Sequence, residues 1–269
     1  MPYLSMHPVI TLGNNSKFVK PSIPKLSMAS AISRQTDAEK HYNMEQARFV
    51  SHYAKKLANH LGLSQDEQHV ISLAGLLFNI GKHPETEGYW TKEGKLSPDE
   101  RKEMEGYPKR GAEELRQYLR KESNNEKLLS WLHEKGIELN PSLRTKIRIY
   151  LEQAAIMIEQ HKFQVDRKGY PKPQMHSASD AGQIIGLIDA YGALINPRPY
   201  RTTGKSPAQA FKILSEEVGS KWKPHLVEAL IHVFPELNHS KTLLDQRCRI
   251  NQKRDEGVIS INLKHVRVC

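Results

Sequence analysis

Apolar residues recur at helical intervals through most of the chain, from about residue 38 onward. An apolar or aromatic residue stands at every fourth position from Phe49 to Leu61, and the run from Val70 to Leu77 follows the i, i+3, i+4, i+7 pattern of a buried helix face. The pattern predicts further helices over 147–161, 178–194 and 226–234. We therefore expect an all-α bundle of about six helices or more.

Three segments carry the signature of a helix start. A Ser followed three positions later by Glu or Gln forms a capping box, in which each side chain bonds the other residue's backbone N–H. A Pro at the first helical position fits because its missing N–H needs no partner there. The segments are Ser64–Glu67, Ser97–Glu100 and Ser206–Gln209, the last two with Pro98 and Pro207.

The two ends of the chain lack this periodicity. Residues 1–38 contain Pro2, Pro8, Pro21 and Pro24 and are expected to form a leader or arm, either disordered or extended. The helical domain is expected over 39–237, and 238–269 form a basic extension. In that extension apolar and polar residues alternate from Ile259 to Leu263, which favours a short terminal β-strand.

Composition narrows the choice of partner. The chain has 269 residues, a formal charge of +10 and a pI near 9.4, which favour an anionic partner such as a nucleotide, a nucleic acid or an acidic protein surface. A soluble basic protein without such a partner fits equally well. Cys248 and Cys269 lack zinc-binding spacing. No apolar run approaches the ~20 residues that span a bilayer, and no secretory signal is present. We expect a cytoplasmic protein.

Four ordered blocks of sequence resemble one known family. They are Ala74–Lys82, Gly169–Pro171, Ile188–Leu194 and Arg198–Arg201. Their order and spacing resemble the HD-GYP domain, the branch of the HD superfamily associated with hydrolysis of cyclic di-GMP. The resemblance covers residues 42–236 and implies a helical bundle. It also implies a site with two or three metal ions, which activate a water and stabilise charge in the displacement.

Most metal-ligand positions of that family hold other residue types here. Phe78 and Asn79 stand where the family has adjacent His and Asp ligands, and Gly192 stands where a second Asp often follows Asp189. A phenyl ring donates nothing to a metal, and a neutral amide is a poor substitute for a carboxylate. We therefore expect no metal, no cofactor and no catalytic residue. The resemblance marks these positions of a vestigial metal site: Gln46, Phe78, Asn79, Tyr107, His161 and Asp189.

Two of these positions keep ligand residue types, and both have ordinary structural uses. His161 at a helix end is expected to be hydrogen-bonded. Asp189 lies in an apolar stretch, so it is expected to be buried and paired with Lys162 or Lys82.

Basic side chains near the vestigial site favour binding of an anion without metal. Guanidinium groups make bidentate contacts to phosphate, although a helix-end anchor explains Arg198 equally well. The resemblance also implicates the Gly169–Pro171 loop in contacts with diguanylate cyclase domains, but Arg167 replaces the usual Gly before it. The candidate residues for binding cyclic di-GMP are Lys82, Lys162, Tyr170, Arg198 and Arg201.

The chain also carries an expected insertion at about residues 122–145. It contains a short apolar helix and is either a lid over the old cleft or a passive surface elaboration.

These features predict a catalytically inactive HD-GYP-like regulatory module that binds cyclic di-GMP or a signalling protein. One alternative is an active phosphohydrolase whose ligands have moved to other histidines. His52 and His60 are about 12 Å apart along one helix, too far to share an ion. A second alternative is nucleic-acid binding through the basic tail, which carries no recognised reading motif.

Overall fold

The computed structural model describes residues 28–82, 88–89, 92, 94–134, 137, 139, 141–172, 178–196, 203–234 and 237, with the side chains of 28–43 and 141–142 left outside that description. Within these residues every regular element is a helix, as the periodicity predicted. No described helix combines the length and the apolar character needed to cross a membrane. The strand expected near Ile259 lies outside the described residues.

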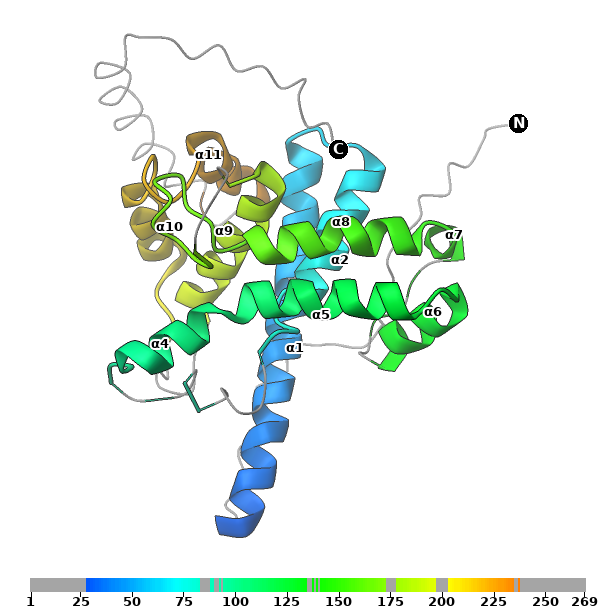
Figure 1. The fold of residues 1–269 in the computed structure, drawn as a ribbon. Coiled ribbons are helices and arrows are strands. Elements are labelled where there is room, and N and C mark those ends of the chain that lie inside the picture. The colour runs from blue at the N-terminus through cyan, green and yellow to red at the C-terminus, as the bar shows by residue number, and fades with distance from the viewer. Residues whose placement is uncertain are drawn as a thin grey trace.

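The helices follow one another along the chain, and the connections between them differ widely in length (Figure 1). Their bounds are α1 Met28–His60, α2 Gln65–Leu77, α4 Pro98–Glu105, α5 Tyr107–Lys121, α6 Asn125–Glu134, α7 Pro141–Arg144, α8 Ile147–Gln160, α9 Asp180–Ile195, α10 Pro207–Glu216 and α11 Pro224–Val233. The capping boxes expected at Ser64, Ser97 and Ser206 are all present, and each begins its helix at the next residue.

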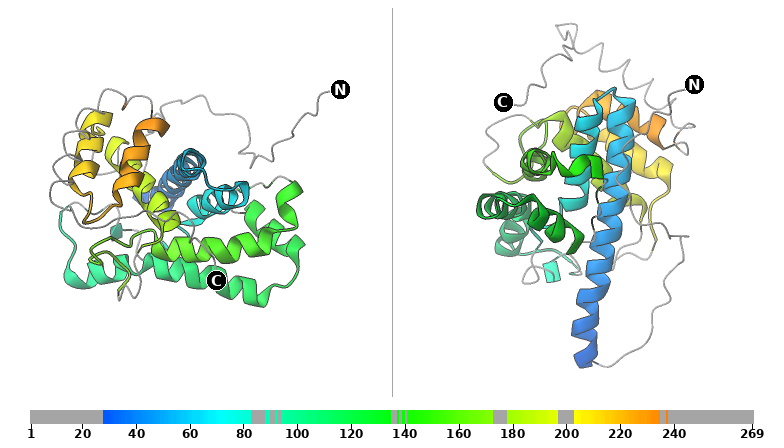
Figure 2. Two further views of the ribbon diagram at one scale, coloured as in Figure 1. Left: turned by 90° about the horizontal axis from the view of Figure 1, so that it is seen from above. Right: turned by 90° about the vertical axis from the view of Figure 1, so that its right-hand side faces the viewer.

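The bundle is organised around α2 and the C-terminal half of α1. Helix α1 packs on α2, α9 and α11, while α5 and α8 lie side by side and α8 also packs on α2 (Figures 1 and 2). Fully buried side chains such as Leu57, Ile71, Leu115, Leu151 and Ile188 join these helices in one core. Burial of each such side chain stabilises the fold by about 1.5–3 kcal/mol.

Two close backbone contacts hold the end of α2 against the start of α5 and the end of α8 against α9. A Cβ on Gly81, just after α2, would lie 2.1 Å from the carbonyl oxygen of Tyr107 at the start of α5. A Cβ on Gly186 in α9 would lie 2.0 Å from the carbonyl oxygen of His161, just after α8. Only glycine permits both approaches, so these two positions fix the geometry of the region where the vestigial site is expected.

The segment expected to be an insertion lies at the opposite end of α5 and α8. Its helix α6 buries Leu128 and Leu132 and packs against α8. Tyr107 begins the 15-residue α5 and the insertion follows its end, so about 22 Å of helix separates α6 from the site. The insertion extends the core at that end, and its position does not match a lid.

Candidate functional site

Asp189 is the centre of a buried polar cluster contributed by three segments. The Gln46 side chain in α1 donates a hydrogen bond to one carboxylate oxygen of Asp189 in α9. The ammonium of Lys162, just after α8, lies 2.5 Å from the other oxygen. Asp189 is 5 % exposed, whereas the Lys162 side chain is 21 % exposed. Of the two lysines expected to pair with Asp189, Lys162 therefore forms the ion pair.

Asp189 is charged at neutral pH because its cationic neighbours outweigh the effect of burial. Burial alone would raise the pKa of this carboxyl, but the charges of Lys162 and Lys82 and the hydrogen bond from Lys162 lower it to about 2. One buried negative charge thus faces two lysines, in the place where the family resemblance expects a carboxylate facing metal ions.

His161 forms a second polar pair beside the first. Its Nδ1 lies 2.6 Å from the carbonyl oxygen of Ile158, so Nδ1 carries the proton and donates it. Its Nε2 lies 2.6 Å from the hydroxyl oxygen of Tyr107 and accepts a hydrogen bond from that hydroxyl. Burial and the charge of Lys162 together lower the pKa of His161 to about 3. His161 is therefore neutral with both ring nitrogens engaged, as expected for a hydrogen-bonded helix-end histidine.

Aromatic rings fill the space around these two pairs. Phe78 is fully buried, with its ring centroid 5.3 Å from that of His161 in an edge-on contact. Tyr107 lies between His161 and Tyr170, with ring centroids 5.4 and 6.4 Å away. The ammonium of Lys82 lies 5.5 Å from the centroid of the Tyr107 ring. Burial raises the pKa of the Tyr170 hydroxyl, which therefore remains protonated at neutral pH.

The remaining ligand positions of the family also hold groups without metal-binding character. Both side-chain polar atoms of Asn79 are buried, and the part of the chain that the structure describes offers them no hydrogen-bond partner. At Gly192 a Cβ would lie 2.8 Å from the ring of Phe49, so this ring occupies the space that an aspartate there would need.

The donor set does not fit the metal centre that the family resemblance implies. Among the described residues, no group of three or more His, Cys, Asp and Glu side chains is arranged to hold an ion. His161 already uses both nitrogens, and Asp189 is bound by an amide and an ammonium. The ammonium of Lys162 would also repel a cation at this carboxylate.

The loop after α8 reaches the site through Tyr170, whose backbone N–H donates to the carbonyl oxygen of Lys162 at 3.2 Å. Arg167 adopts a φ of 61°, the left-handed conformation that glycine adopts without strain. At the position where the family resemblance expects a Gly, Arg167 thus adopts a conformation that favours glycine. Asp166 anchors it through a 2.8 Å backbone bond to the carbonyl oxygen of Ser220.

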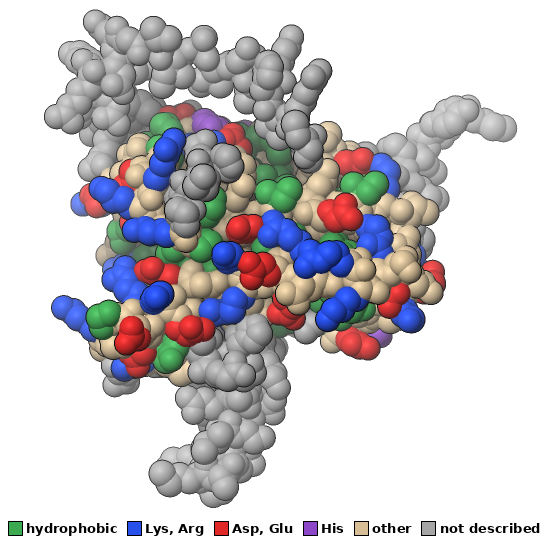
Figure 3. Space-filling model, viewed as in Figure 1, with side chains coloured by type: hydrophobic (Ala, Val, Ile, Leu, Met, Phe, Trp, Pro, Cys, Tyr) green, Lys and Arg blue, Asp and Glu red, His purple; other side chains and the backbone are tan. Residues whose placement is uncertain are grey.

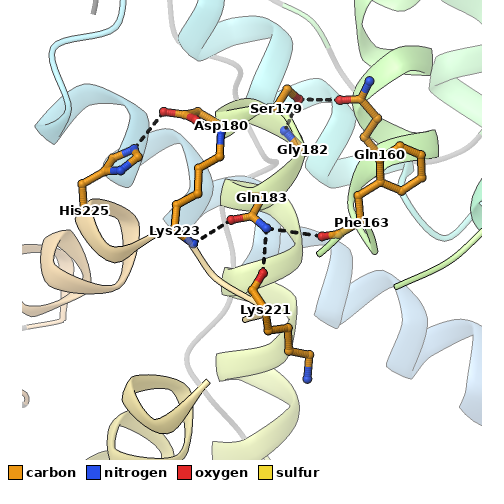
Figure 4. Close-up of polar contacts among 9 residues, drawn as sticks. All are labelled: Gln160, Phe163, Ser179, Asp180, Gly182, Gln183, Lys221, Lys223 and His225. Atoms are coloured by element: carbon orange, nitrogen blue, oxygen red, sulfur yellow. Dashed lines mark hydrogen bonds and ion pairs between the residues drawn. The ribbon is translucent and has the colours of Figure 1, made fainter. Parts of the chain in front are cut away.

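Gln183 in α9 connects this loop to the segment before α11 (Figure 4). Its amide nitrogen donates to the carbonyl oxygens of Phe163 and Lys221 at 3.3 and 2.8 Å, and its oxygen accepts from the backbone of Lys223 at 2.9 Å. Gln183 is fully buried, so these bonds satisfy a side chain that burial would otherwise penalise.

Asp180 joins the first turns of α9 and α11 (Figure 4). Its carboxylate lies 2.5 Å from the Lys223 ammonium and 2.8 Å from Nε2 of His225. The hydrogen bonds from His225 and Lys223 lower the pKa of Asp180 to about 2 against the effect of burial.

The structure brings together most of the residues that the sequence marked. Gln46, Phe78, Tyr107, His161, Lys162, Tyr170 and Asp189 are linked by the contacts above, and Asn79 and Lys82 adjoin them. Arg198 and Arg201 lie outside the described residues. Sequence reasoning did not foresee the Gln46–Asp189 or Tyr107–His161 bonds. The sequence did contain a signal for both bonds. Gln46 and Tyr107 stand at expected metal-ligand positions, and both side chains can donate a hydrogen bond to a ligand residue type that is kept.

Comparisons with known proteins give relatives that act on cyclic dinucleotides. The chain is 27 % identical over 183 residues to the cyclic di-GMP phosphodiesterase response regulator RpfG of Xanthomonas campestris pv. campestris, covering 68 % of this chain and 41 % of that protein. It is 24 % identical over 196 residues to the 3'3'-cGAMP-specific phosphodiesterase 1 of Vibrio cholerae, covering 72 % and 38 %. A cyclic di-GMP phosphodiesterase of Thermotoga maritima is 23 % identical over 213 residues, covering 79 % and 49 %.

The matched region thus spans less than half the length of these relatives. Among solved structures, the chain resembles Bd1817, an HDG"Y"P protein from Bdellovibrio bacteriovorus, with a TM-score of 0.49 and 16 % identity, covering 77 % of this chain and 57 % of that one. The sequence model of the HD domain family matches residues 28–226, which is most of the chain. The chain therefore belongs to the HD domain family.

Proposed function

We propose that this domain is a regulatory HD-GYP-like module that binds a cyclic dinucleotide, with cyclic di-GMP as the first candidate, and does not hydrolyse it. The Lys162–Asp189 ion pair carries the proposal, because an ammonium stands against the carboxylate where the family expects metal ions. Positive side chains then supply the counter-charge for phosphate.

Binding without hydrolysis follows from what each group offers. An ammonium attracts a phosphate oxygen, but unlike a metal ion it does not generate a hydroxide nucleophile from a bound water. Lys82 and Lys162 supply positive charge, and the partly exposed Tyr170 supplies a ring on which a base can stack. Arg198 and Arg201 are expected to add bidentate phosphate contacts. The named activities of the three relatives support a cyclic dinucleotide as the ligand.

A signalling protein is the second candidate, and the packing around the site favours it. Phe78 and Tyr107 are buried and the ring of Phe49 fills the space beside Gly192, so the old metal site is occupied by the protein's own side chains. In this version the loop that contains Tyr170 contacts a partner such as a diguanylate cyclase domain, and the buried cluster holds the loop in place.

The nucleic-acid alternative rests on the tail after Leu237, which lies outside the described residues. The face shown in Figure 3 has Lys and Arg side chains interspersed with Asp and Glu rather than a single-sign stripe. Ion pairs such as Arg116–Glu159 and Lys109–Glu113 belong to the helices of this face. We expect any salt-sensitive DNA binding to disappear when the tail is removed.

Calorimetry with cyclic di-GMP in the presence of a chelator tests the proposal. We expect saturable binding that weakens in Arg198→Ala and Arg201→Ala and is unchanged in Arg120→Ala, an exposed arginine near the far end of α5. Chromatography of the incubated nucleotide should show no hydrolysis. Two or more tightly held metal ions per chain together with hydrolysis would establish the active-enzyme alternative. Absence of binding would favour the protein-partner version.

A further inference from the structure

His60 and His232 meet on the surface of the bundle, away from the site described above. His60 is the last residue of α1 and His232 lies in the last turn of α11, and these two helices pack together. The imidazole centroids are 4.3 Å apart and the rings are 18° from parallel. About 21 Å of helix separates His60 from Gln46, so this pair is distinct from the Asp189 cluster.

Both rings are accessible and chemically available. His60 and His232 are exposed, and within the described part of the chain neither imidazole makes a hydrogen bond or an ion pair. Neutral imidazole is the form that binds metal ions.

The surroundings favour one shared cation. The C-terminal end of a helix carries partial negative charge from its unpaired carbonyls. His60 and His232 lie at two such ends, so both helices favour a cation there. A ring nitrogen binds Zn²⁺ at about 2.0–2.1 Å, so two nitrogens on one ion lie about 3–4 Å apart. The rings are stacked, so their in-plane nitrogen lone pairs do not converge as they stand. Both side chains must rotate to bring one nitrogen of each onto a shared ion, and exposed side chains change rotamer readily.

We propose that His60 and His232 form a two-histidine site for a borderline divalent transition ion, Zn²⁺, Ni²⁺ or Cu²⁺. Imidazole is a preferred ligand of these ions, and hard ions such as Mg²⁺ prefer oxygen. The described residues offer no third His, Cys, Asp or Glu ligand in this region, so water completes the coordination. A bound ion would link the end of α1 to α11 across the surface of the bundle.

Zinc titration of the full chain, first stripped with a chelator, tests the site. We expect wild type to bind one Zn²⁺ per chain more than His60→Asn, His232→Asn and the double variant. The three variants should bind equal numbers of ions, because neither histidine forms the site without the other. His133→Asn, which removes a single exposed histidine from α6, should retain wild-type binding. A titration with Mg²⁺ should show no binding that is lost in the His60→Asn or His232→Asn variant.

Thermal unfolding gives a second readout. Zn²⁺ should raise the Tm of wild type and of His133→Asn more than that of either ligand variant, because an ion bound only to the folded state stabilises it. Melting of the variants without metal checks that each one folds. The proposal is overturned if all variants bind as many ions as wild type, or if only one of the two histidines affects binding.

Discussion

Lys162 and Asp189 form a buried ion pair at the place where the family resemblance implies metal ions. A buried carboxylate facing metal ions needs their charge, and here Lys162 supplies positive charge while Gln46 donates to the second oxygen. Removal of one member of a buried ion pair leaves the other charge uncompensated, which costs about 3–5 kcal/mol. Replacement of both members by neutral residues leaves no uncompensated buried charge and so avoids most of that cost.

We therefore expect Lys162→Met to lower the free energy of unfolding by about 3 kcal/mol. This is the low end of the range, because Lys82 still supplies positive charge near Asp189. Combining it with Asp189→Asn should restore part of the loss. Urea unfolding of wild type, both single variants and the double variant gives the coupling energy. Additive effects of the two changes would contradict a direct ion pair.

At the scale of elements, the sequence predicted what local interactions decide. Ser64, Ser97 and Ser206 begin helices because the capping groups lie within four residues of one another. The short helix in the insertion was also expected, but its place at the far end of α5 depends on how Leu128 and Leu132 pack. Local patterns do not contain that information.

The loop after α8 shows a local feature that sequence reasoning treated as uncertain. Arg167 adopts a φ of 61°, and a side chain in this conformation costs about 1–2 kcal/mol. Neighbouring bonds such as that from Asp166 to Ser220 hold the loop in place despite this cost.

We expect Arg167→Gly to raise the free energy of unfolding by about 0.5–1 kcal/mol. Relief of the strained φ should exceed the added flexibility of glycine in the unfolded chain. Arg167→Ala removes the charge but keeps the strain, so it should stay near wild type. Urea unfolding of the three proteins is the measurement, and equal stabilities of the Gly and Ala variants would contradict a conformational origin.

At the scale of the whole molecule, the site depends on contacts between distant parts of the chain. Gln46 and Asp189 are 143 positions apart, and Tyr107 and His161 are 54 apart. The family resemblance grouped these residues into one expected site, which periodicity alone does not do. It did not show which side chains pair, because that depends on the close approaches at Gly81 and Gly186.

The buried titratable groups predict how the stability of the whole protein depends on pH. The pKa of His161 is lowered to about 3, so below its ordinary value near 6.5 the unfolded chain binds a proton that the folded chain does not. As the pH is lowered from about 6.5, His161 alone should therefore decrease the free energy of unfolding by about 1.4 kcal/mol per pH unit. Asp180 and Asp189, with pKa values lowered to about 2, contribute stability that is complete above about pH 4 and is lost toward pH 2.

Urea unfolding between pH 7.5 and about pH 3 measures this dependence. Exposed carboxylates with ordinary pKa values titrate alike in the folded and unfolded chain and add little to it. His161→Gln should be less stable than wild type at neutral pH but should lose less stability between about pH 6.5 and 4, because the group that titrates there only in the unfolded chain is gone. Asp180→Asn should keep the wild-type slope in that upper range and flatten the curve below about pH 4. Parallel curves for wild type and His161→Gln in the upper range would show that His161 takes up its proton in the folded protein. That outcome would contradict a neutral imidazole locked between Tyr107 and Ile158.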